Sequence, residues 1–224
     1  MMDLPDDPNI QSGNVTGSVT ANAAGDRENS VFVRFLNDNG STGSLRVVKD
    51  YPAPDNFTYL VPALPQSSLV VAATSGLYSG GPFSVAFRDN VAPGQNVSLE
   101  VPTAPIPLLP NPGAMGVDTS TEFSWTGSAG VYLVSFIDQD FYRGAFVVTS
   151  SNQTNLPAFS GFALNANGEH HWRVETHGSY DDMDAAAGPT GYLQAIVDDD
   201  VPAGPRRGDG TFTISTWFQM FTAP

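Results

Sequence analysis

The chain of 224 residues contains no cysteine and a single lysine, Lys49. Without cysteine it can form neither a disulfide framework nor a thiolate zinc site. Nine basic residues stand against 23 acidic ones, for a formal net charge of −14. DNA and RNA are bound by clustered Lys and Arg that displace counterions from phosphates, and such a cluster is missing here. We therefore expect no nucleic-acid partner and no binding to an anionic membrane surface.

Long apolar runs are also missing from the sequence. No stretch approaches the ~20 apolar residues that a helix needs to cross a bilayer, so we expect no direct membrane insertion. The start of the chain is acidic between residues 3 and 7 and lacks the cationic start and apolar run of a signal peptide. Residues 1–12 are polar, contain Pro5 and Pro8, and are predicted to be a disordered tether.

Glycine and proline are abundant, with 22 and 18 copies, and they punctuate segments in which apolar and polar residues alternate. A period of two is typical of β-strands with one buried face. Within residues 13–103 the alternation predicts seven strands and essentially no helix. These segments are 13–20, 30–36, 44–49, 56–64, 68–73, 82–88 and 95–101.

The first domain, residues 13–103, resembles the carboxypeptidase regulatory-like or transthyretin-like sandwiches of bacterial surface proteins. The resemblance is carried by GNVTGSV at 13–19 and by FTYLVPAL at 57–64 followed by LVVAA at 69–73. The chain departs from that pattern at residues 65–67, where the family usually has a glycine-tyrosine pair. An immunoglobulin-like sandwich is the alternative.

Five prolines lie between residues 102 and 112, and we place a domain boundary at residues 103 and 104. Proline fixes φ and cannot donate a ladder hydrogen bond, so this stretch is predicted to be an extended, semi-rigid junction without strand pairing. The five residues are Pro102, Pro105, Pro107, Pro110 and Pro112.

The second domain, residues 104–224, resembles a fibronectin type III module. Six segments match strands B, C, C′, E, F and G of that family: 122–126, 131–137, 145–149, 154–157, 169–175 and 210–221. The resemblance places Trp125 in the core on strand B, and Trp172 and Val174 at inward positions of strand F. His170 stands where the family usually has its corner tyrosine. The predicted fold class is all-β, with two tandem antiparallel β-sandwich domains.

Catalytic or metal chemistry finds little support in the histidines. On an extended strand His171, Arg173, Glu175 and His177 share one face, and His171 and His177 lie about 20 Å apart at 3.3 Å per residue. That distance is too long for one metal ion, so we expect a solvated face of alternating charges. No zinc-protease helix motif, nucleophile elbow or phosphate-binding glycine loop is present. We expect no enzyme.

The segment 178–209 is a long insertion between the proposed strands F and G, and loops of this length are usually functional or disordered. Clustered carboxylates could supply the six to eight oxygens that calcium takes. A solubilising acidic loop is the alternative. We also expect its tyrosines Tyr180 and Tyr192 to be available for binding. The carboxylates proposed for calcium are Asp181, Asp182, Asp198, Asp199 and Asp200.

The same insertion contains Arg207-Gly208-Asp209, the tripeptide that integrins recognise, and a chance occurrence is the better interpretation. Both family resemblances imply domains that display loops. We therefore expect a monomeric, non-catalytic binding or adhesion module of a bacterial surface protein. Its partner would be a protein or carbohydrate of the cell envelope. Structural spacer domains are the alternative, and an accessory domain of a carbohydrate-active enzyme is a remote one.

The resemblances also imply export to the periplasm, the outer surface or the medium. Our interpretation is that an export signal, with or without a lipid-bearing cysteine, preceded Met1 and was removed.

Overall fold

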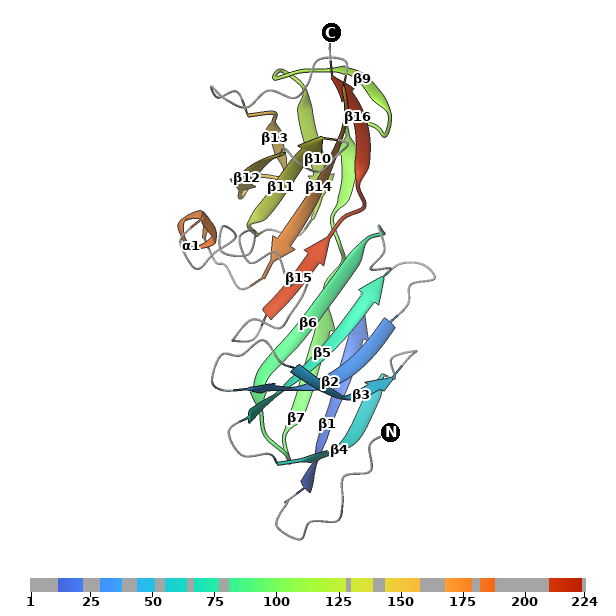
Figure 1. Ribbon diagram of the computed structural model, residues 1–224, viewed down its shortest axis with the longest axis vertical. Helices are drawn as coiled ribbons and strands as arrows, with labels where there is room; N and C mark the ends of the chain where they lie inside the picture. The colour runs from blue at the N-terminus through green and yellow to red at the C-terminus, as the bar shows by residue number, and fades with distance from the viewer. Residues whose placement is uncertain are drawn as a thin grey trace. The chain divides into compact units, whose positions relative to one another are not determined.

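The computed structural model describes residues 12–21, 29–37, 44–50, 55–63, 67–76, 81–127, 130–138, 144–157, 168–178, 182–187 and 210–222. These residues form β-strands almost throughout, with one short helix, so the all-β prediction is confirmed (Figure 1). Two compact units are present. Unit 1 comprises Met1–Ser75, Val85–Pro102 and Pro205–Gly210, and unit 2 comprises Gly76–Ser84, Thr103–Gly204 and Thr211–Pro224.

The described strands of unit 1 form two sheets, and each of the seven predicted strands is present close to its predicted position. In the first sheet the central strand is antiparallel to one neighbour and parallel to the other. The first sheet has the order β4 (Asn56–Pro62), β1 (Ser12–Ala21), β7 (Asn96–Val101). The second has the order β6 (Phe83–Val91), β5 (Ser67–Gly76), β2 (Asn29–Asn37), β3 (Ser44–Asp50).

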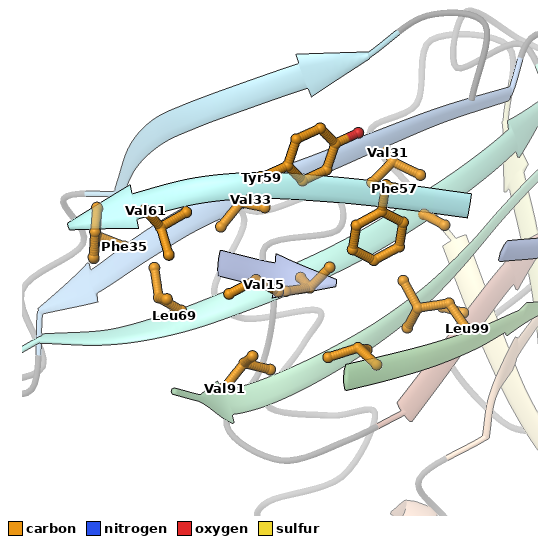
Figure 2. Close-up of a cluster of buried hydrophobic side chains, with 14 of the residues drawn as sticks. Val15, Val31, Val33, Phe35, Phe57, Tyr59, Val61, Leu69, Val91 and Leu99 are labelled. Atoms are coloured by element: carbon orange, nitrogen blue, oxygen red, sulfur yellow. The ribbon is translucent and has the colours of Figure 1, made fainter. Parts of the chain in front are cut away.

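The core of unit 1 lies between the inner faces of these two sheets (Figure 2). Side chains alternate strictly between buried and exposed along β4 and β7, as a half-buried strand requires. Val31, Val33 and Phe35 of β2, spaced two residues apart, all face this core. A one-residue slip of the register would expose all three, so burial determines how β2 pairs.

Gly17 allows the chain to approach itself closely at the centre of β1. It is paired with Phe57 on β4 and with Val97 on β7. A Cβ atom at this position would overlap the Val97 carbonyl oxygen and the Phe57 ring. The absence of a side chain at residue 17 is therefore what lets the Phe57 ring lie across β1 and stack on Tyr59, with ring centroids 5.2 Å apart.

We expect Gly17→Ala to lower the free energy of unfolding of unit 1 by roughly 1–3 kcal/mol, because the added methyl group meets backbone that cannot move aside. Chemical denaturation monitored by circular dichroism measures this change. Thr20→Ala, at an exposed position of the same strand, is the matched control and should be nearly neutral. Equal stability of the two variants would contradict the packing described for Gly17.

The described strands of unit 2 also form two sheets. One has the order β13 (Gln153–Asn155), β10 (Glu122–Thr126), β8 (Ile106–Leu109). The other runs from β12 (Gly144–Thr149) through β11 (Tyr132–Asp138) to β14 (Glu169–His177). Beside β14 lie β15 (Gly210–Ile214) and β16 (Phe218–Thr222), and β16 pairs in parallel with β9 (Ala114–Val117).

The prediction that the proline-rich stretch forms no strand is wrong at residues 106–109. Strand β8 pairs antiparallel with β10, and Pro107 stands opposite Trp125. The Ile106 N–H donates to Thr126 Oγ1 at 3.2 Å. Because β8 ends the described order of its sheet, it needs hydrogen bonds on one side only, and Pro107 is tolerated at such a position.

Trp125 and Trp172 occupy the core of unit 2, as predicted, and both are fully buried. They belong to one cluster with Phe123 and Phe136. Phe123 meets Trp172 edge to face, with ring centroids 5.1 Å apart. Edge-to-face contacts of this kind add to the stabilisation that comes from burial alone.

Hydrogen bonds to Asp118 close the turn that connects β9 to β10. Its Oδ1 accepts hydrogen bonds from the Ser120 N–H at 2.8 Å and from Ser120 Oγ at 2.6 Å. The Asp118 N–H donates to Thr121 Oγ1 at 3.0 Å. The hydrogen bonds from Ser120 favour the ionised carboxylate, so they hold the pKa of Asp118 below its ordinary value of 3.8.

A depressed pKa in the folded state means that the ionised turn contributes stability above the pKa of the unfolded chain. That contribution is lost as the pH falls through the folded pKa. We expect an NMR titration of the Asp118 carboxyl carbon to give a midpoint below 3.8. Ser120→Ala should raise this midpoint, because it removes the hydroxyl that donates to Asp118. Thr119→Ala keeps both hydrogen bonds from Ser120 and should leave the midpoint unchanged. A midpoint unchanged by Ser120→Ala would refute this account of the turn.

Candidate functional site

The outer face of the β12-β11-β14-β16 sheet, on the side away from Trp125 and Trp172, brings together aromatic and charged side chains. Strand register places Phe146, Ser135 and Arg173 in one row across the three strands. The next row contains Gly144, Ile137, His171 and Gln219. We call Phe146, His171, Arg173, Glu175 and Trp217 the outer-face cluster.

Strand G of the sequence prediction, residues 210–221, is interrupted in the structure. It forms β15 and β16, and residues 215–217 between them are not part of either strand. β15 pairs with the end of β14 at residues 175–177, and β16 pairs with its start at residues 169–172. The prediction of one continuous strand is therefore wrong at this point.

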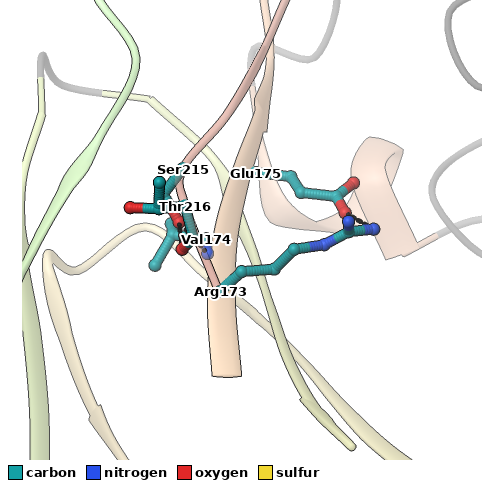
Figure 3. A network of polar contacts seen from close by, with 5 residues as sticks. All are labelled: Arg173, Val174, Glu175, Ser215 and Thr216. Atoms are coloured by element: carbon teal, nitrogen blue, oxygen red, sulfur yellow. Dashed lines mark hydrogen bonds and ion pairs between the residues drawn. The ribbon is translucent and has the colours of Figure 1, made fainter. Parts of the chain in front are cut away.

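Ser215 keeps the interrupted strand bonded to Val174 of β14 (Figure 3). Its N–H donates to the Val174 carbonyl at 2.8 Å, and its Oγ accepts from the Val174 N–H at 2.9 Å. The hydroxyl also donates to the Thr216 carbonyl at 2.9 Å. In a regular antiparallel pair a backbone carbonyl would accept the Val174 N–H. Here a side chain replaces it, and the backbone is free to change direction after residue 215.

The change of direction brings Trp217 to the outer face of the sheet. The Arg173 guanidinium lies over its ring, 4.1 Å from the centroid, as a cation–π pair. Arg173 Nη2 also contacts Glu175 Oε1 at 2.6 Å (Figure 3). Irregularities in strands re-aim side chains in this way, and they are enriched next to functional sites.

His171 continues the cluster toward the start of β14. Its ring meets Trp217 at a centroid distance of 6.5 Å, nearly perpendicular. Its Nε2 lies 3.6 Å from Glu169 Oε1. The expected solvated face of alternating charges is wrong at Glu175, which is only 8% exposed. Arg173 and Glu175 of this strand face contact each other, and Arg173 and His171 both lie against the Trp217 ring.

Part of the outer face is covered by the insertion between β14 and β15. Helix α1 (Met183–Ala187) packs Ala186, which is fully buried, against Val131 and Leu133, with Val148 of β12 beside them. Asp182 lies at the start of this helix, and its Oδ1 accepts the Ala185 N–H at 2.7 Å. This is a helix N-cap interaction, which satisfies a donor that has no partner within the helix.

Most of the residues predicted to bind calcium or a ligand lie outside the described part of the chain. Asp182 is described, is exposed and caps α1. Within the described residues no group of three or more His, Cys, Asp or Glu is arranged to hold a metal ion. The calcium site therefore stays a prediction. Outside the described residues lie Asp181, Asp198, Asp199, Asp200, Tyr180, Tyr192 and Arg207-Gly208-Asp209.

The described aromatic residues divide clearly between the core and the surface. Phe57 and Tyr59 are core residues of unit 1. Phe146 is 44% exposed on β12, and Trp217 is half-buried against Arg173. Trp217 was missed because a strand assumed to be continuous hides an interruption. The Ser-Thr pair at 215 and 216, whose side chains can bond to backbone, is the one local signal that could have indicated it.

A comparison with protein-family models gives no match, and a comparison with curated proteins gives none either. Among the described residues, no helix has the length and apolar character needed to cross a membrane.

We expect Ser215→Ala to destabilise unit 2 by about 1–3 kcal/mol, because the buried Val174 N–H loses its acceptor. Ser215→Thr retains the hydroxyl and is the conservative control. Thermal unfolding followed by near-ultraviolet circular dichroism reports both stability and the environment of Trp217. If Ser215→Ala unfolds at the same temperature as the wild type, the Ser215 hydroxyl is not needed as the acceptor for the Val174 N–H. A melting temperature that changes only in Ser215→Thr would give the same conclusion.

Proposed function

We propose that the chain is a non-catalytic binding or adhesion module of an exported bacterial protein, and that the outer-face cluster contacts its ligand. The ligand is a protein or carbohydrate of the cell envelope. Unit 2 is proposed to be a fibronectin type III-like domain, and unit 1 a carboxypeptidase regulatory-like or transthyretin-like sandwich.

The strand pairing of unit 2 supports its assignment. In immunoglobulin-type sandwiches strands A, B and E share one sheet, while C, F and G share the other. With β8 as A and β10, β13, β11 and β14 as B, E, C and F, the observed sheets follow that division. In unit 1 the first two strands belong to different sheets, since β1 pairs with β4 and β7 while β2 pairs with β3 and β5. This argues against the immunoglobulin-like alternative there.

The observation that carries the binding proposal is the position of Trp217. A continuous strand would satisfy its backbone more simply, yet the chain interrupts it, uses Ser215 as a substitute acceptor and holds a tryptophan against Arg173 on the outer face. Tryptophan and arginine are the residues most enriched among those that dominate binding energy at interfaces. The exposed ring of Phe146, two strands away, adds apolar area to the same face.

The spacer function remains as a second candidate because the cluster satisfies itself internally. Arg173 has Glu175 and Trp217 as partners, and His171 has Glu169. Such pairing could equally have the purely structural role of stabilising β16 against β14. The two candidates differ in what happens when the aromatic surface is removed without disturbing the fold.

The test is retention of the purified protein on isolated bacterial envelope fractions, protein and polysaccharide fractions separately. We expect Phe146→Ala combined with Trp217→Ala to weaken retention by at least tenfold, since truncating central aromatic contacts typically costs more than about 1.4 kcal/mol. Glu122→Ala, on the exposed face of the other sheet, should bind like the wild type. All proteins should show the same circular dichroism spectrum before binding is compared.

If the wild type is retained by neither kind of fraction, or if the double variant is retained as well as the wild type, the outer-face cluster is not a binding surface. The spacer function then becomes the better account.

A further inference from the structure

Strand β4 is an edge strand of unit 1 that lacks the usual protection against pairing with another chain. Native edges are protected by proline, by charged side chains or by short length. Among the other described edge strands of unit 1, β3 carries Arg46, Lys49 and Asp50, and β7 carries Glu100. Strand β4 has seven residues, no charged side chain, and a proline only at its last position.

The hydrogen bonds of β1 identify which backbone groups of β4 face away from the sheet. The Val19 N–H donates to the Asp55 carbonyl at 2.9 Å, so residue 55 faces β1. Antiparallel pairs alternate between bonded and non-bonded positions. The groups of Phe57, Tyr59 and Val61 therefore also face β1, and those of Asn56, Thr58 and Leu60 point outward. Among the described strands β4 pairs with β1 alone.

We propose that two copies of the chain associate through β4, antiparallel and about a two-fold axis at Thr58, which joins the two β4-β1-β7 sheets into one. This differs from the monomer expected from the sequence, and the oligomeric state in solution distinguishes the two. With Thr58 opposite its symmetry mate, Asn56 of each copy meets Leu60 of the other. Three outward residues on each strand, each donating and accepting once, allow up to six hydrogen bonds in the seam.

The side chains on this edge suit a self-complementary seam. Asn56 and Thr58 are exposed and uncharged, and Leu60 is 67% exposed although it is apolar. Thr58 would pair with Thr58, a cross-strand combination that stabilises sheets. A two-fold axis closes the assembly at two copies, because each edge is consumed by the other.

The charge distribution along β4 permits a second copy aligned in this register. The chain carries −14 overall, and β4 itself carries none of that charge. The nearest carboxylate before the strand is the exposed Asp55. In the proposed register each Asp55 lies opposite Val61 of the other copy, about 20 Å along the seam from the second Asp55 at ~3.4 Å per residue. No like charges face each other.

The association should be weak and should strengthen with salt. One strand-to-strand seam is smaller than a stable interface, so we expect a dissociation constant on the order of 10⁻⁴ M. The two acidic chains repel at long range, and salt shortens the range of that repulsion from ~30 Å at 0.01 M to ~8 Å at 0.15 M. Sedimentation equilibrium of the whole chain at these two salt concentrations should therefore show more dimer at the higher one.

The first experiment uses the absence of cysteine from the chain. Thr58→Cys introduces the only thiol, and directly opposed residues of a bonded antiparallel pair have Cα atoms ~5.5 Å apart, within disulfide range. Mild oxidation should give a cross-linked dimer. Ser98→Cys, at an exposed position on the opposite edge of the same sheet, should remain mostly monomeric under identical conditions.

The second experiment needs no covalent trapping. Thr58→Lys places two like charges opposite each other at the axis and should weaken dimerisation at least tenfold, whereas Ser98→Lys should leave it unchanged. Wild-type protein that sediments as a monomer at ~1 mM and 0.15 M salt would overturn the proposal. So would a dimer that Thr58→Lys does not weaken, or equal cross-linking of the two cysteine variants. The last two results would place the contact on another surface.

Discussion

Strand β14 is the element on which both faces of unit 2 depend. Its inward side chains, Trp172 and Val174, fill the core. Arg173 and Glu175, which alternate with them along the strand, face outward. Because alternate residues of a strand point to opposite faces, the pairing that buries Trp172 also determines where Arg173 lies. A single register with β11 therefore decides the packing of the core and the composition of the candidate binding surface.

The interruption opposite β14 shows how local polar chemistry can redirect a strand without leaving buried backbone unsatisfied. A gap of three residues in the strand that pairs with β14 would ordinarily leave the Val174 N–H and carbonyl without partners, at a cost of about 1–3 kcal/mol for each buried group. Ser215 satisfies both groups, one with its N–H and one with its hydroxyl. The redirected segment then places Trp217 on the outer face of the sheet, against Arg173. In a continuous strand its direction would have followed the alternation of β16.

The two units handle their exposed strand edges differently, and the difference suggests separate uses. Strand β8 exposes Ile106, Leu108 and Leu109 but interrupts its donors with proline. Strand β4 exposes Leu60 and keeps its outward N–H groups. Apolar side chains alone permit contact, whereas an unblocked edge also permits strand addition. The proposed pairing of two chains uses the edge of β4, whereas the proposed ligand surface uses Phe146 and Trp217 of unit 2, so the two can be tested independently.

The resemblance to a fibronectin type III module predicted the burial of Trp125 and Trp172, whereas alternation in the sequence was enough to predict the strands of unit 1. These depend on a local period of two, which each segment carries within itself. Strand β8 was missed because proline weighs against a strand wherever it occurs, and only the sheet shows that β8 needs one bonded side. Trp217 was missed because its position depends on a bond between residues 215 and 174. Contacts over such separations are set by tertiary packing, and no local pattern encodes them.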